Sequence, residues 1–150
     1  MEHRKYMMLA LSQARLAAEK GEVPVGTVIV KNGEVIAKAH NCTEKEKNPL
    51  CHSEIVALNN AVRSTGAKNL EGCTVYVTLE PCPMCMGALL NARVSGIVFG
   101  AYEKRSGAVV SAAQLGDIEF FRKPSILGGY MEKECRELLS GFFKKRRTDI

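Results

Sequence analysis

Apolar side chains recur at helical spacing near both ends of the chain. The N-terminal set lies on one helical face and comprises Met7, Met8, Leu11, Ala14 and Ala18. Gly21 follows this set and is expected to end the helix. The C-terminal set also shares one face and comprises Met131, Cys135, Leu138, Leu139, Phe142 and Phe143. The pattern therefore predicts an amphipathic helix at each end of the chain.

Between these helices, β-branched and alternating runs predict strands. Residues 25–30 and 34–39 form two such runs joined by Asn32-Gly33, and Asn-Gly between two strands indicates a tight hairpin. The next expected elements are a helix over 52–65, a strand over 73–79, a helix from Pro81 to about Arg93 and a strand over 96–101. Residues 102–130 are rich in glycine and predict one short helix and one short strand.

The alternation of strand and helix over residues 34–101 favours an α/β fold with parallel pairing that begins from the hairpin. Helices that follow parallel strands begin at the same edge of a sheet. We therefore expect the helix at His52 and the helix at Pro81 to begin side by side. The chain has no internal repeat, low-complexity tract or linker, so residues 1–150 are expected to form a single domain.

Two short motifs lie at these helix starts, His52-x-Glu54 and Cys82-x-x-Cys85. Two cysteines three positions apart place both sulfurs on one side of a helix, where unpaired N–H groups favour thiolates. With the His52 imidazole they make a zinc set with one position left for water, whereas a structural zinc needs a fourth protein ligand. Glu54 can reach such a water and carry a proton from it to a departing amine. H-x-E followed by P-C-x-x-C is the signature of zinc-dependent base deaminases.

A redox pair and a structural zinc site are weaker interpretations of the two cysteines. A redox pair would leave His52 without a role. A structural zinc site would need Cys42, Cys51 or Cys73 as its fourth ligand. Cys51 adjoins His52 and can hardly ligate the same ion, and Cys73 opens a strand. Cys42 stays open as a fourth ligand.

The net charge and the expected cellular compartment narrow the range of possible partners and chemistries only modestly. The formal net charge of +5 and the pI near 8.9 tilt the chain toward polyanionic partners. Ser12, Gln13 and Arg15 interrupt the N-terminal apolar stretch, which therefore lacks signal-peptide character, and no run approaches the ~20 apolar residues that span a bilayer. A cytoplasmic protein without a membrane partner is expected, and in a reducing compartment a close cysteine pair indicates metal or redox chemistry.

The chain resembles bacterial tRNA-specific adenosine deaminases of the cytidine-deaminase-like superfamily. The resemblance is carried by the two motifs and by GEVPVGTVIV (21–30), LEGCTVYVTLEPCPMC (70–85) and ECRELLSGFFKKRR (134–147). It implies a three-layer α/β/α fold with a mixed sheet of about five strands, and a zinc site at helix N-termini. It also implies a zinc-dependent hydrolase with one Zn²⁺ per chain, acting as a homodimer. The implied reaction is hydrolytic deamination of the wobble adenosine of a tRNA anticodon loop to inosine by a zinc-activated water.

The resemblance also assigns substrate contacts. Asn41 matches the family's base-contacting asparagine, and Glu103 falls where the family has an acidic residue near the target ribose, usually aspartate. Phe143 lies on the C-terminal helix that leans on the RNA, and a cationic tail follows it: Lys144, Lys145, Arg146 and Arg147. A plainer interpretation is that Phe143 continues the apolar stripe and that the cations only complement the helix dipole.

Some positions depart from the family pattern. Phe121-Arg122 stands where these deaminases typically carry Asn-His, residues 111–130 are unlike the usual run, and Ser53 replaces the usual alanine. The 102–130 region flanks the pocket in the family. The alternative is therefore a zinc deaminase of a free base or nucleoside such as guanine, cytosine or cytidine. A non-enzymatic, zinc-stabilised RNA-binding module is a third hypothesis, but it would have no use for Glu54.

Overall fold

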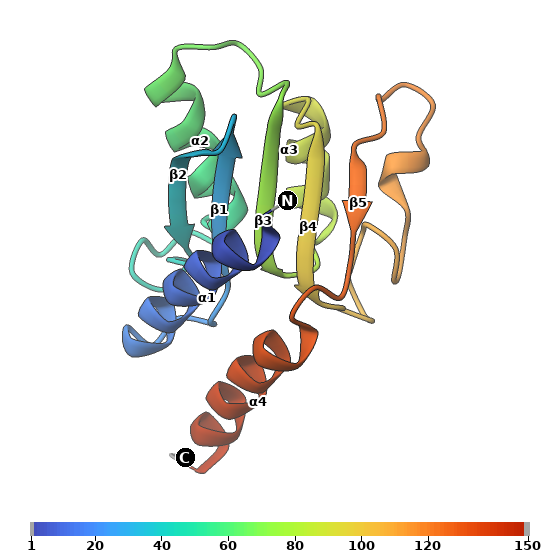
Figure 1. The fold of residues 1–150 in the computed structure, drawn as a ribbon. Helices are drawn as coiled ribbons and strands as arrows, with labels where there is room; N and C mark the ends of the chain where they lie inside the picture. The colour runs from blue at the N-terminus through green and yellow to red at the C-terminus, as the bar shows by residue number, and fades with distance from the viewer. Residues whose placement is uncertain (1, 149–150) are drawn as a thin grey trace.

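A five-stranded sheet lies between two layers of helices in the computed structural model, which describes residues 2–148 (Figure 1). Its elements are α1 (His3–Glu19), β1 (Gly26–Lys31), β2 (Glu34–His40), α2 (Ser53–Thr65), β3 (Cys73–Leu79), α3 (Pro83–Asn91), β4 (Gly96–Ala101), η1 (Leu115–Asp117), β5 (Ser125–Leu127) and α4 (Glu132–Thr148). The strand order is β2-β1-β3-β4-β5. The expected three-layer fold with a mixed sheet is confirmed, and so are the short helix and short strand within 102–130.

The predicted hairpin joins β1 and β2, which pair antiparallel. Asn32 and Gly33 have φ values of 51° and 76°, the two positive angles that a tight primed turn requires. β1 also pairs antiparallel with β3, whereas β3, β4 and β5 are mutually parallel.

β2 does not pair with β3, which corrects the expectation of uninterrupted parallel pairing from residue 34. β1 lies between them and is antiparallel to both, so β2 and β3 still point the same way. α2 follows β2 and α3 follows β3, and both helices therefore begin at the same edge of the sheet. The prediction that the His52-x-Glu54 and Cys82-x-x-Cys85 motifs lie side by side is therefore unaffected by this correction.

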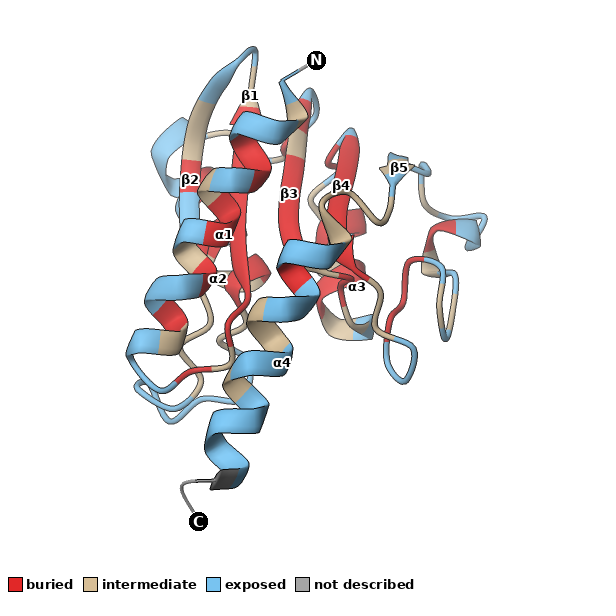
Figure 2. Cartoon of the chain, turned by 60° about the horizontal axis from the view of Figure 1, so that its bottom comes forward, coloured by how far each residue is buried: buried red, intermediate tan, exposed pale blue. Residues whose placement is uncertain are grey.

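Each face of the sheet has its own core. α2 and α3 cover one face and α1 and α4 the other (Figures 1 and 2). Neighbouring residues of one strand alternate between the cores, as Ile29 and Val28 do. α1 approaches β1 closely at Gly26, where a Cβ atom would lie 2.0 Å from the Ala10 carbonyl oxygen.

Three helices differ in detail from the sequence expectation. On α1, Met8 is 43% exposed although it was expected in the core, where Tyr6 and Ala10 lie instead. α3 begins at Pro83 rather than Pro81, because the Cys82 backbone is extended (ψ 174°) and Cys82 is the N-cap residue. On α4 the apolar stripe leaves the core, and Figure 2 shows the C-terminal half of this helix mostly exposed.

Within residues 2–148, none of the helices combines the length and apolar character that crossing a membrane requires.

Candidate metal centre and substrate pocket

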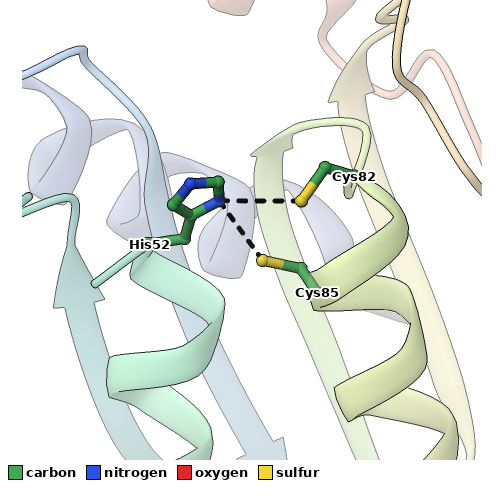
Figure 3. A group of neighbouring side chains, drawn as sticks. All are labelled: His52, Cys82 and Cys85. Atoms are coloured by element: carbon green, nitrogen blue, oxygen red, sulfur yellow. Dashed lines mark hydrogen bonds between the residues drawn. The ribbon is translucent and has the colours of Figure 1, made fainter. Parts of the chain in front are cut away.

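Three predicted residues meet where α2 and α3 begin. His52 is the N-cap residue of α2, Cys82 is the N-cap residue of α3, and Cys85 lies in the first turn of α3. The His52 Nδ1 atom lies 3.7 Å from the Cys82 Sγ atom and 3.4 Å from the Cys85 Sγ atom (Figure 3). Among the described residues, these side chains form the one group of three or more His, Cys, Asp and Glu ligands that could hold a metal ion.

These distances fit a tetrahedral zinc site. Zn–S bonds of about 2.3 Å and Zn–N bonds of about 2.0–2.1 Å at tetrahedral angles place nitrogen and sulfur about 3.6 Å apart. The two observed separations, 3.7 and 3.4 Å, lie on either side of that value. Two sulfurs and one imidazole are also the donor types that zinc prefers.

Hydrogen bonds within the cluster move the pKa values of the two cysteines in opposite directions. A hydrogen bond from the Cys85 thiol, and a second contact with His52, lower the pKa of Cys82 to about 4. The same hydrogen bond and burial raise the pKa of Cys85, so the pair shares one proton. The hydrogen bond with Cys82 raises the pKa of His52. The Cys82 sulfur is thus the group of this cluster whose thiolate form is favoured, and a thiolate is the form that binds a metal ion.

Cys42 does not join this group. Its Sγ atom lies 3.9 Å from the Cys51 carbonyl oxygen, and neither residue belongs to the metal-ligand cluster. The structure thus gives no support to Cys42 as a fourth ligand. Cys73 and Cys135 are buried in the two cores.

Glu54 lies in the first turn of α2 and is only 4% exposed. The Ser53 hydroxyl is 3.0 Å from its carboxylate and 2.8 Å from the Thr27 hydroxyl. Burial raises the pKa of Glu54, while its backbone hydrogen bond and the Ser53 hydroxyl oppose that rise. A carboxyl group with a raised pKa can both accept and donate a proton near neutral pH.

A cavity of about 250 Å³ opens beside Glu54. Its lining comprises Val23, Val25, Asn41, Thr43, His52, Glu54, Leu79, Glu80, Cys82, Glu103 and Ser106. The helix starts contribute His52, Glu54 and Cys82, whereas two irregular segments form walls: the 41–52 loop and the 102–114 loop. The Asn41 Oδ1 atom accepts a hydrogen bond of 2.8 Å from the Ser53 N–H group, which anchors the first loop to α2.

The cavity adjoins a larger groove of about 530 Å³, and the two share Val23, Leu79 and Glu103. Phe143 and four cationic side chains line this groove: Lys104, Arg105, Arg136 and Arg147. Phe143 is 44% exposed, so it lies at the surface beside this groove rather than in the core.

The predicted cationic tail divides between two places. Arg147 lines the groove, whereas Arg146 donates a hydrogen bond of 3.3 Å to the Gly21 carbonyl oxygen and lies over the Phe142 ring. Lys144 and Lys145 are exposed and lie outside the groove lining. Arg136 was not predicted from the sequence, although Arg136, Phe143 and Arg147 share one helical face at i, i+7 and i+11.

The Phe121-Arg122 departure lies away from the cavity. Both residues line a hollow with Glu71 and Arg93, near the start of β3, whereas the cavity lies beyond the end of that strand. Of the 102–130 region, only Glu103 and Ser106 line the cavity. The part of this region that flanks the cavity is therefore its first segment, the 102–114 loop.

Comparison with known proteins agrees with this geometry. The MafB19-like deaminase family model matches residues 1–147. A tRNA-specific adenosine deaminase from Bacillus subtilis is 44% identical over 143 residues, which are 95% of this chain and 89% of that protein. The chain belongs to the tRNA-specific adenosine deaminase family.

Solved structures agree on the fold of this deaminase. A structure from work on A-to-I editing by tRNA deaminases at the wobble position superposes with a TM-score of 0.87 and 37% identity, covering 91% of this chain and 99% of the other. A guanine deaminase from Bacillus subtilis superposes with a TM-score of 0.65 and 35% identity, over 68% of this chain and 66% of the other. The match to the tRNA-editing structure thus extends over more of both chains.

Proposed function

We propose that this deaminase converts the adenosine at the wobble position of a tRNA anticodon loop to inosine and releases ammonia. The observation that carries the proposal is the buried Glu54 carboxyl in one cavity with His52 and Cys82, in a chain 44% identical to a tRNA-specific adenosine deaminase. His52, Cys82 and Cys85 would hold one zinc ion per chain. When bound, zinc supplies the Lewis acidity that lowers the pKa of a water molecule toward neutrality.

Glu54 is the proposed proton carrier of the reaction. It accepts a proton from the attacking water and delivers a proton to the amino group that leaves C6 of adenine. Its raised pKa suits both transfers, and the Ser53 hydroxyl fixes the carboxylate orientation. A metal site with only a structural role has no use for such a carboxyl, which argues against the non-enzymatic hypothesis.

Asn41 and Glu103 are proposed to hold the target nucleoside. The Asn41 carbonyl oxygen is engaged by the Ser53 N–H group, so the NH₂ group is the end that can donate to a base. Glu103 lies where the cavity meets the groove, a position that suits contact with a ribose hydroxyl.

The groove suits the nucleotides that flank the target. Sequence-specific recognition of RNA commonly uses single-stranded loops with splayed bases, stacked on aromatic side chains and bound through phosphates. Phe143 can stack on a base, while Arg136 and Arg147 can bind phosphates. From the sequence-predicted tail, Arg147 has the position that best supports an RNA contact, and Lys144, Lys145 and Arg146 would act at longer range.

The structure weakens the free-base alternative. Its main support was the unusual 111–130 segment, but Phe121 and Arg122 lie outside the cavity. A free guanine, cytosine or cytidine would also leave the cationic groove without a ligand. We further propose that the protein is a cytoplasmic homodimer and that each copy consists of a single domain.

The test is ammonia release by the zinc-loaded protein. A tRNA with a wobble adenosine is compared with the same tRNA carrying wobble guanosine, and with free adenosine, cytosine, cytidine and guanine. Inosine at the wobble position, with no ammonia from the guanosine control, supports the proposal. Turnover of a free base alone would replace it with the alternative.

A further inference from the structure

Two buried carboxylates hold the two walls of the cavity. Glu22 is 1% exposed and accepts hydrogen bonds of 3.0 and 2.9 Å from the N–H groups of Glu44 and Lys45. Glu80 is 2% exposed and accepts hydrogen bonds from the N–H groups of four residues: Glu103 at 3.1 Å, Val109 at 3.2 Å, Val110 at 2.8 Å and Ser111 at 2.9 Å. Each carboxylate thus engages one wall loop and not the other.

The 102–114 loop wraps around Glu80. The Ser111 hydroxyl adds another donor to the same carboxylate. Gly107 lies so close that a Cβ atom there would be 2.4 Å from the Glu80 carboxyl carbon. The Glu80 carboxylate therefore accepts five hydrogen bonds from this loop, which encloses it.

These contacts have a specific consequence for the cavity. The metal-ligand cluster and Glu54 sit at the starts of α2 and α3, whose own backbone hydrogen bonds hold them. Thr43, Glu103 and Ser106 face the cavity from the loops, which have no helix or strand to fix them. In these loops, charge-assisted hydrogen bonds to a buried carboxylate hold the backbone in place, as the hydrogen bonds of a helix or strand do elsewhere.

We propose that Glu22 and Glu80 are positioning residues that fix the two walls of the substrate cavity without taking part in metal binding or proton transfer. The proposal rests on the proposed function and adds to it the residues that shape the site around the target nucleoside. It separates the site into a base, built by helix starts, and two walls, each of which is attached to one buried carboxylate in addition to the loop's other hydrogen bonds.

Glu80→Gln and Glu22→Gln test this division, because each variant keeps the side-chain shape and removes the charge. Glu71→Gln is the matched control, since Glu71 is an exposed glutamate paired with Arg93 near the start of β3. Amide hydrogen exchange should rise over residues 103–111 in Glu80→Gln and over 43–46 in Glu22→Gln, and in neither segment for the control. This reciprocal pattern would not arise from a general loss of stability.

Kinetics with a wobble-adenosine tRNA then links the walls to the substrate. Each wall variant should raise KM by roughly 10-fold or more, change kcat less, and keep the zinc content of the unaltered protein. Ser111→Ala removes a single hydrogen-bond donor to Glu80 and should raise KM by roughly twofold or more. This milder variant still tests the proposal if Glu80→Gln fails to fold.

The outcomes are distinguishable. Loss of zinc or of kcat alone in the wall variants would overturn the inference, and so would unchanged KM despite altered exchange. Absence of turnover by the unaltered protein would instead refute the proposed function, while the exchange measurement would still decide whether each carboxylate holds its own loop.

Discussion

The Ser53 hydroxyl donates a hydrogen bond of 3.0 Å to the carboxylate of Glu54. Both side chains are buried, and the Thr27 hydroxyl lies 2.8 Å from the Ser53 oxygen. Ser53 thus connects the proposed proton carrier to β1. In the sequence, Ser53 stands out only as a small departure from the usual alanine, yet the structure gives it a direct influence on Glu54.

Ser53→Ala should move the pH dependence of the reaction. Burial raises the pKa of Glu54 and the Ser53 hydroxyl opposes that rise, so its removal raises the pKa further. The ionised carboxylate then requires a higher pH, so the acidic limb of kcat/KM should shift toward higher pH. A pH series of initial rates measures this shift, and a limb that stays in place or moves down contradicts the assignment.

Glu54→Ala should separate metal binding from chemistry. The ligand cluster is complete without Glu54, so metal analysis should still find about one zinc per chain. Turnover should fall by at least about 10²–10⁴-fold, the usual contribution of a positioned general acid–base group. Single-turnover assays with a wobble-adenosine tRNA measure the loss. Near-normal turnover would remove Glu54 from the mechanism.

Much of the site could be predicted from the sequence, because local patterns identify the strands and helices and the shared edge of parallel strands brings the two helix starts together. The strands at 73–79 and 96–101 match the structure in both bounds, since the first is rich in β-branched and aromatic residues and the second is an apolar run. Asn32-Gly33 identified the hairpin, and the shared edge of parallel strands brought His52 to Cys82 and Cys85. The position of β1 between β2 and β3 did not matter to that outcome.

The contacts that sequence could not supply join residues far apart in the chain. Glu80 accepts from Ser111, 31 positions later, and nothing in the local pattern of either residue indicates the pairing. Arg136 lines the groove beside Tyr102, 34 positions earlier, and donates a hydrogen bond of 3.1 Å to the Tyr102 carbonyl oxygen. Periodicity shows which face of a helix is apolar, but not which loop folds back on a buried charge.

The proposed metal centre can be tested by replacing one cysteine at a time. Cys82→Ala should lose zinc, because two ligands cannot close a tight site, and should lower the thermal midpoint of the chain. Cys42→Ser is the matched control, since Cys42 lies outside the ligand cluster and should leave the zinc content unchanged. Metal analysis after removal of loosely bound ions distinguishes the two. Zinc loss in the control would bring Cys42 back as a ligand.

Arg147 provides a sharp test of the RNA groove because a neighbouring cation on the same helix serves as its control. Arg147 lines the groove beside Phe143, whereas Lys144 lies outside the groove lining. If Arg147 binds a phosphate, Arg147→Gln should weaken RNA binding and reduce the slope of log affinity against log salt by about one. Lys144→Gln should leave that slope nearly unchanged, although both variants lose one positive charge. Titrations of an anticodon stem-loop at several salt concentrations give the two slopes. Equal changes in both would mean that α4 attracts RNA only through its net charge, and that the groove does not seat a phosphate.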